Sequence, residues 1–209
     1  MRYLNKIVFI NSAAIRYSEV QLDGNIHLIG TQGVGKSTIL RAILFFYNAD
    51  TQRLGIPVEK KSYQDYYFPY ADSSIIYEVA REDGWFTVLS YKTMNRICYR
   101  FIASPYRPDL FIDEEGAPYP SDRIRSVLDK NGIKYSGAIS TYEEYRNILY
   151  GNSDNKRDYS CYSLMESGSY QNIIRTIQNV LLNSRLEADY IKQTIITSLN
   201  EADSVIYLS

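Results

Sequence analysis

The chain has 209 residues, which is enough for one substantial hydrophobic core. A formal net charge of −1 and a pI near 5.9 exclude a protein held to nucleic acid by bulk positive charge, although they allow a local basic face. The two cysteines, Cys98 and Cys161, lack metal-ligand spacing, and the sequence shows neither a secretory signal nor a membrane-length apolar run, so we expect a reduced, cytoplasmic protein without membrane contact.

Tyrosine is unusually common, with 21 copies in the chain. Many of the tyrosines lie in strand-like stretches, where a half-buried ring can keep its hydroxyl hydrated. Basic residues do not alternate with them systematically, as they do in surfaces that stack nucleic-acid bases. We therefore interpret the tyrosines as packing residues.

The chain opens with two segments whose composition predicts an antiparallel hairpin. Residues 6–11 are mostly apolar, and residues 17–22 alternate polar and apolar side chains, as a half-buried strand does. Asp23 and Gly24 then predict a turn into a third, short strand at residues 25–29. Two antiparallel strands are thus expected before the segment that follows.

Residues 30–38 read Gly-Thr-Gln-Gly-Val-Gly-Lys-Ser-Thr, which fits the phosphate-loop pattern of glycine, four residues and Gly-Lys-Ser. The apolar residues 39–46 behind it predict a helix. A strand, a glycine loop and a helix direct successive backbone N–H groups and a helix N-terminus at one anion. We therefore predict a nucleoside triphosphate site in which Lys36 reaches the β- and γ-phosphates and the Ser37 hydroxyl binds Mg²⁺. Its predicted residues are Gly30, Thr31, Gln32, Gly33, Val34, Gly35, Lys36, Ser37 and Thr38.

The pattern of the next part of the chain predicts an irregular surface segment followed by an antiparallel sheet. Residues 48–71 suggest a surface excursion with some order. Three alternating segments joined by tight turns then predict an antiparallel meander, at residues 74–79, 85–91 and 96–102. A fourth strand is expected at residues 110–113, before a turn at residues 114–116.

The remainder is predicted to be mainly helical. Ser121 is expected to cap a helix that carries Ile124, Val127 and Leu128 and that ends at residues 131–132. After a short strand at residues 133–136, Thr141 and Glu144 form a capping box for a helix through Leu149. Apolar stripes predict two further helices, within residues 173–181 and 187–199. Because neither a repeat nor a long linker is visible, we treat residues 1–209 as one domain.

Hydrolysis of a bound triphosphate needs an acid that holds Mg²⁺ and a base that orients water. The only stretch with residue types suitable for this role is residues 110–114, where Asp113 and Glu114 follow three apolar residues. Pro108 shortens that apolar run, whereas a central parallel strand should be apolar almost throughout. The pattern favours a solvated turn over a catalytic pair, and the sequence contains no ABC signature motif.

These features together resemble the N-terminal half of an SMC-type ABC ATPase head, and within that family the MukB-like bacterial condensins, including the JetC subunit of Wadjet-type defence systems. The similarity rests on residues 10–14, on the loop at residues 30–38, and on residues 141–145 with 159–170 and 173–175. It implies an α/β P-loop NTPase fold: an ABC-type head half-domain with an antiparallel β meander and a closing helical part. It also implies that Asn11, Ser12 and Ala13 lie near the adenine of ATP.

The resemblance implies partners as well. These are the C-terminal lobe of the same head, which carries signature and Walker B motifs, a second SMC-like head, kleisin-type subunits and DNA, in the bacterial cytoplasm. The chain is then expected to be part of a longer coiled-coil protein and to bind ATP without turnover by itself. One departure is that residues 135–140 lack the glutamine with which many ABC heads contact magnesium.

Two alternatives remain open. One is a self-contained small P-loop kinase or NTPase that uses Asp113 and Glu114 as its acids. The other is a regulatory module that binds nucleotide only to dock an unrelated protein. For DNA contact, five arginines would have to form a basic face, although scattered solvated side chains are the simpler interpretation; they are Arg96, Arg100, Arg107, Arg123 and Arg125.

Overall fold

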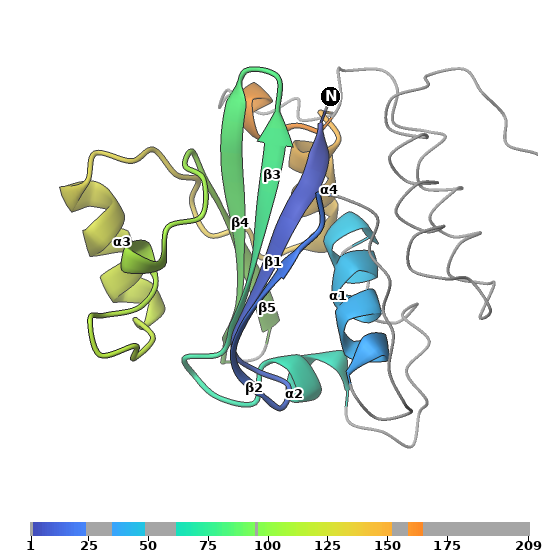
Figure 1. Ribbon diagram of the computed structural model, residues 1–209. Helices are drawn as coiled ribbons and strands as arrows, with labels where there is room; N and C mark the ends of the chain where they lie inside the picture. The colour runs from blue at the N-terminus through green and yellow to red at the C-terminus, as the bar shows by residue number, and fades with distance from the viewer. Residues whose placement is uncertain (1, 24–34, 49–61, 95, 152–158, 165–209) are drawn as a thin grey trace, which may run out of the picture.

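The computed structural model describes residues 2–23, 35–48, 62–94, 96–151 and 159–164. These residues form a mixed α/β structure around an open, five-stranded antiparallel sheet of order β2-β1-β3-β4-β5 (Figure 1). The strands are β1 (Tyr3–Ser12), β2 (Ile15–Gln21), β3 (Ser74–Arg81), β4 (Gly84–Thr93) and β5 (Arg96–Ile102).

The register confirms the predicted hairpin and the predicted meander. Ile7 of β1 pairs with Val20 of β2 on one side and with Tyr77 of β3 on the other. Strands β3, β4 and β5 follow as an antiparallel meander. The strand predicted at residues 25–29 lies outside the described residues.

Helices cover both faces of the sheet (Figure 1). On one face lie α1 (Lys36–Asn48), α2 (Tyr63–Tyr67) and α4 (Tyr142–Leu149), with a 3-10 turn at Ser160–Tyr162. On the other face lie α3 (Ser121–Lys130) and a 3-10 turn at Pro108–Leu110. The predicted helix after the phosphate loop is thus confirmed as α1, and the predicted helix through Leu149 as α4.

The sheet separates two hydrophobic clusters, because successive residues of a strand point to opposite faces. Phe9 and Tyr77 pack in the cluster that holds α1 and α4. Ile10 and Ile76 pack in the cluster that holds α3. Strand β3 is consequently buried along almost its whole length.

Most of the described tyrosines are packing residues, as their sequence context predicts, although Tyr17, Tyr66, Tyr70 and Tyr142 are exposed. Tyr67, Tyr77, Tyr145 and Tyr150 rank among the largest fully buried side chains. Their rings pack against other rings of the cluster; Tyr99 and Tyr145, for example, have ring centroids 4.4 Å apart.

Two strands predicted from the sequence are wrong. Residues 110–113 do not form a strand: a 3-10 turn occupies Pro108–Leu110, and Ile112 makes only an isolated bridge with Pro118. Residues 133–136 also contribute only an isolated bridge, between Tyr135 and Ile102. Proline has no backbone N–H to donate to the hydrogen-bond ladder of a sheet, which explains why the apolar residues after Pro108 do not extend the sheet.

The predicted surface excursion with some order at residues 48–71 is correct in part where the structure describes it, since α2 supplies order and Tyr66 and Tyr70 are exposed, but three side chains enter the core. Tyr63, Tyr67 and Phe68 are buried in the same cluster as α1. Ser62 caps α2, since its hydroxyl accepts a hydrogen bond from the Asp65 N–H at 3.1 Å.

The two predicted N-caps have opposite outcomes. The Thr141 hydroxyl accepts a hydrogen bond from the Glu144 N–H at 3.2 Å, which confirms this cap of α4. Ser121 is instead the first residue of α3; Pro120 holds the cap position, and no side chain caps that helix. The helices predicted within residues 173–199 lie outside the described residues.

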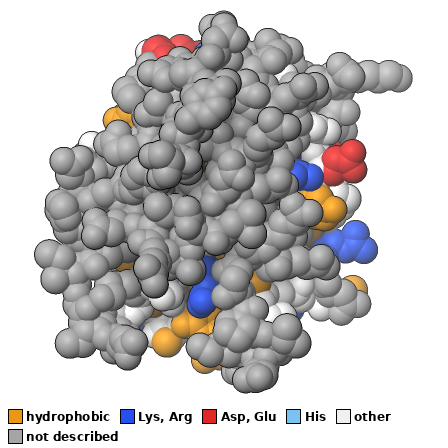
Figure 2. All heavy atoms as spheres, turned by 90° about the vertical axis from the view of Figure 1, so that its right-hand side faces the viewer, with side chains coloured by type: hydrophobic (Ala, Val, Ile, Leu, Met, Phe, Trp, Pro, Cys, Tyr) orange, Lys and Arg blue, Asp and Glu red, His pale blue; other side chains and the backbone are white. Residues whose placement is uncertain are grey.

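On the face shown in Figure 2, the described basic and acidic side chains lie at separate places and do not gather into a patch of one sign. Within the described ranges, no helix is long and apolar enough to cross a membrane.

Candidate functional site

The end of the predicted phosphate loop lies at the start of α1. Residues 30–34 are outside the described residues, but Gly35 is described and has a φ of +88°. This left-handed conformation favours glycine, and nothing lies within 4 Å of the position that a Cβ would take. The helix then begins at Lys36, so the motif ends in the first turn of a helix, as the pattern predicts.

This N-terminus carries one exposed residue, Ser37, whose backbone donor has no acceptor among the described residues. The N–H groups of Thr38 and Ile39 both donate to the Gly35 carbonyl, at 3.0 and 3.1 Å. The first turn also contains no acidic side chain. The partial positive charge of the helix end is therefore available to an external anion.

Thr38, the last residue of the motif, is buried and held by α2. The Tyr67 hydroxyl donates to the Thr38 carbonyl at 2.7 Å. The hydroxyls of Tyr66 and Thr38 lie 3.2 Å apart and share a hydrogen bond. No pattern in the sequence indicates this contact, because α2 has only five residues and Tyr67 lies 29 positions along the chain from Thr38.

The hairpin turn between β1 and β2 contains the second group of predicted site residues. Asn11 and Ala13 have φ angles of 44° and 54°, which non-glycine residues seldom adopt. The Asn11 side-chain amide donates to the Asp72 carboxylate at 2.9 Å, and the Asn11 carbonyl accepts from the Ser73 hydroxyl at 2.5 Å. The Ser12 hydroxyl donates to the Tyr67 carbonyl at 2.8 Å. The turn is consequently fixed to the segment that also holds Thr38.

A cavity of about 510 Å³ opens beside this turn. Asn11, Arg16 and Tyr17 line it from the hairpin, and Glu115 and Pro118 line it from the turn after residue 112. Its lining combines a cation with a carboxylate, so the charges of the cavity favour no particular sign of ligand.

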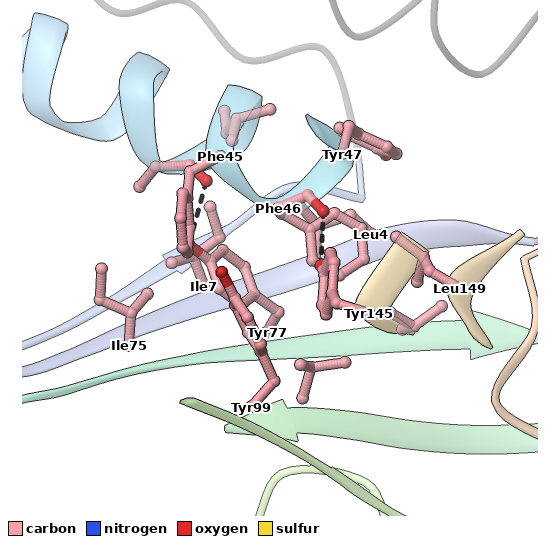
Figure 3. Close-up of a cluster of buried hydrophobic side chains, with 14 of the residues drawn as sticks. Leu4, Ile7, Phe45, Phe46, Tyr47, Ile75, Tyr77, Tyr99, Tyr145 and Leu149 are labelled. Atoms are coloured by element: carbon pink, nitrogen blue, oxygen red, sulfur yellow. Dashed lines mark hydrogen bonds between the residues drawn. The ribbon is translucent and has the colours of Figure 1, made fainter. Parts of the chain in front are cut away.

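Tyrosine hydroxyls hold α1 along its length. Tyr77 donates to the Ala42 carbonyl at 3.1 Å, and Tyr145 donates to the Phe46 carbonyl (Figure 3). The Tyr150 hydroxyl donates to the Tyr47 carbonyl. The last four carbonyls of a helix have no partner within it, and the two tyrosine hydroxyls satisfy those of residues 46 and 47, for which the described residues offer no other donor.

Asp113 and Glu114 lie in a tight turn. The Asp113 carboxylate accepts hydrogen bonds from the N–H groups of Glu115 and Ala117, at 3.0 and 2.7 Å, and Glu114 is exposed. Residues just before them, Leu110 and Phe111, pack in the cluster on the α3 face of the sheet. The structure therefore does not bring these acids to the N-terminus of α1, which packs on the other face.

Three of the five arginines considered for a basic face are engaged within the chain. Arg100 is buried; its guanidinium donates to the Ser136 carbonyl and lies over the Tyr135 ring. Arg107 pairs with Asp109, and Arg123 lies over the Tyr119 ring. Across the described ranges, no three side chains of His, Cys, Asp or Glu are grouped as metal ligands.

Comparison with known proteins assigns most of the chain to one family. A family model described as "Protein of unknown function (DUF3584)" matches residues 12–207. No curated protein sequence matches the chain.

Proposed function

The chain belongs to the DUF3584 family, and we propose that it is the ATP-binding N-terminal lobe of an SMC-type ATPase head, similar to those of the MukB-like condensins. Under this proposal the lobe is an ABC-type half-domain with a P-loop NTPase fold. It is catalytically incomplete without a C-terminal lobe that carries the signature and Walker B motifs.

One observation carries the proposal: the Gly-Lys-Ser end of a full phosphate-loop motif coincides with the first turn of α1. Gly35 has the left-handed φ that such a loop needs, and the Ser37 N–H is exposed without an acceptor among the described residues. A helix N-terminus with free N–H groups and no carboxylate attracts phosphate. The residues present therefore fit a triphosphate with its magnesium ion.

The other described elements support the same proposal. A β-hairpin precedes the motif in the chain, as in heads of the ABC type, and an antiparallel meander follows it. Asp113, one of the two acids that the sequence offers as catalytic partners, uses its carboxylate to close a turn on the α3 side. This arrangement favours a lobe that binds nucleotide over a self-contained kinase or NTPase.

Two segments of the chain would bind different parts of the nucleotide. Backbone N–H groups of residues 30–35 and the Lys36 ammonium would bind the phosphates, and the Ser37 hydroxyl would bind Mg²⁺. The turn at residues 11–13 would lie near the adenine. When bound, the magnesium ion would offset part of the negative charge of the triphosphate.

The proposal also covers partners and cellular role. The lobe would pair with the C-terminal lobe of its own head, and two such heads would enclose two ATP molecules. Kleisin-type subunits would join the heads, and DNA would be the substrate that the full protein handles in the bacterial cytoplasm.

Calorimetric titration of the purified chain with Mg²⁺-ATP tests the binding step. We expect saturable binding that Lys36→Ala weakens by about 10- to 100-fold, the effect of losing one charge-assisted contact. Ser37→Ala should reduce the gain in affinity that Mg²⁺ gives. Lys130→Ala removes the same charge from the last turn of α3, on the opposite face of the sheet, and should leave binding unchanged.

A phosphate-release assay on the same samples tests the second step. The chain alone should release phosphate at a negligible rate, and turnover should appear once a C-terminal lobe is supplied. Absence of ATP binding, or equal binding by the wild type and Lys36→Ala, contradicts the nucleotide site. Steady release by the chain alone contradicts the half-site and favours the self-contained enzyme.

A further inference from the structure

Helix α2 lies beside two segments that are far apart in the sequence, the hairpin turn of β1 and β2 and the first turn of α1 (Figure 1). One residue of α2 bonds to both. The Tyr67 carbonyl accepts from the Ser12 hydroxyl at 2.8 Å, and the Tyr67 hydroxyl donates to the Thr38 carbonyl at 2.7 Å. Tyr67 is 1% exposed, so both bonds lie inside the protein.

Additional bonds hold each of the two segments to the same stretch of chain. On the helix side, the Tyr66 hydroxyl pairs with the Thr38 hydroxyl at 3.2 Å. On the turn side, Asn11 bonds to Asp72 and to Ser73, at 2.9 and 2.5 Å. Non-glycine residues in the left-handed region, such as Asn11 and Ala13, are strained, so these bonds are needed to hold the turn in its shape.

The ring of Tyr67 is fixed independently of its hydroxyl. It stacks on Tyr63 with ring centroids 4.1 Å apart, and Tyr63 stacks on Phe45 of α1 at 4.5 Å. Replacing Tyr67 by phenylalanine therefore removes the bond to Thr38 while leaving the ring stack and the bond from Ser12 in place. Removing the single hydroxyl oxygen of Tyr67 therefore alters the contact between α2 and the N-terminus of α1.

We propose that Tyr67 is a positioning residue that sets the separation between the hairpin turn and the phosphate-binding end of α1. This inference rests on the proposed function, in which the nucleoside half of ATP lies at the turn and the triphosphate half at α1. A ligand that contacts both segments binds tightly only if they are already arranged, since any rearrangement reduces the binding free energy. A ligand that contacts only the helix end does not depend on that arrangement.

The test compares Mg²⁺-ATP with Mg²⁺-tripolyphosphate, which has the phosphates and no nucleoside, by calorimetric titration. Tyr67→Phe should weaken ATP binding about fivefold, as the loss of one neutral hydrogen bond does, and should change tripolyphosphate binding less than twofold. Ser12→Ala removes the bond on the turn side and should show the same selective loss. Tyr77→Phe is the matched control, because it removes a hydroxyl bonded to the Ala42 carbonyl of the same helix and leaves both bonds of Tyr67 intact.

The outcomes separate this inference from the function on which it rests. If the wild type binds both ligands and Tyr67→Phe weakens both equally or neither, the positioning role is wrong and the nucleotide site stands. The same holds if Tyr77→Phe changes the ratio of the two affinities as much as Tyr67→Phe does. If the wild type binds neither ligand, the proposed function fails and the inference with it. Circular dichroism of each variant identifies a loss of folding, and Ser12→Ala then serves as the deciding variant.

Discussion

The buried tyrosines predict a cooperative unfolding at alkaline pH. Burial raises the pKa of seven described tyrosines well above the ordinary value of 10. Five of them lie in or against α1 and α2, where the charge that each would acquire on ionisation disfavours ionisation of its neighbours. The five are Tyr47, Tyr63, Tyr67, Tyr77 and Tyr145. The pKa of each of these tyrosines is higher in the folded state than in the unfolded state. Their protonation therefore does not reduce the free energy of unfolding below pH 10, and this free energy falls as the pH rises above about 10.

The size of the effect follows from the number of groups. Above pH 10 each tyrosine that stays protonated only in the folded state lowers the free energy of unfolding by about 1.4 kcal/mol per pH unit. Five such groups remove about 7 kcal/mol by pH 11, whereas a protein of this size is stable by about 5–15 kcal/mol. The folded state should therefore unfold between about pH 11 and pH 12.

Two signals recorded together test this prediction, the ultraviolet absorbance of tyrosinate and the circular dichroism of the backbone. The buried tyrosines should ionise together with the loss of backbone structure and not before it. Tyr63→Phe should raise the midpoint pH of unfolding, and Tyr142→Phe should not. Full ionisation near pH 10 with an unchanged backbone signal would refute the reasoning, since it requires rings that water reaches.

Three further predictions concern single side chains. Tyr145→Phe should lower the free energy of unfolding in urea by about 1–3 kcal/mol, because it removes the hydroxyl that pairs with the Phe46 carbonyl at the C-terminal end of α1. The loss should exceed that of Tyr77→Phe, because the Ala42 carbonyl that Tyr77 contacts keeps its intrahelical partner. Equal losses would contradict this. Thr141→Ala should cost about 1 kcal/mol and Ser121→Ala close to none, since only Thr141 caps its helix; similar costs in urea would show that the cap bond contributes nothing. Asp113→Asn should change Mg²⁺-ATP affinity less than twofold in calorimetry, because its carboxylate closes a turn on the α3 face, and a tenfold loss would return Asp113 to the nucleotide site.

Local patterns were sufficient to predict the elements that local interactions determine. The alternation in residues 17–22, the tight turns of the meander and the threonine three residues before Glu144 each specify structure within a few positions. The start of α1 at the end of the glycine motif is of the same kind, since a glycine with positive φ ends the loop where the helix begins.

The contacts around the candidate site could not be predicted in the same way. Ser12 and Thr38 each form a hydrogen bond with Tyr67, which lies 55 and 29 positions away from them, and no periodicity in the sequence encodes such contacts. The short α2 also lacks the length at which an apolar stripe becomes visible. The strand predicted at residues 110–113 is wrong although the local pattern is clear. These residue types fit a strand, but Pro108 starts a 3-10 turn and the Asp113 carboxylate closes the next turn.

The tyrosine content and the candidate nucleotide site are connected through α1. Its C-terminal carbonyls at residues 46 and 47 accept hydroxyls from the side chains of Tyr145 and Tyr150, so the chain itself satisfies that end. At the other end, the exposed Ser37 N–H has no acceptor among the described residues. Tyrosine suits the first task, because its ring fills the core and its hydroxyl reaches a backbone carbonyl, whereas phenylalanine would leave that carbonyl unpaired. A helix held rigidly at one end presents the donors of its other end at a fixed place, which is what binding an anion without prior rearrangement requires.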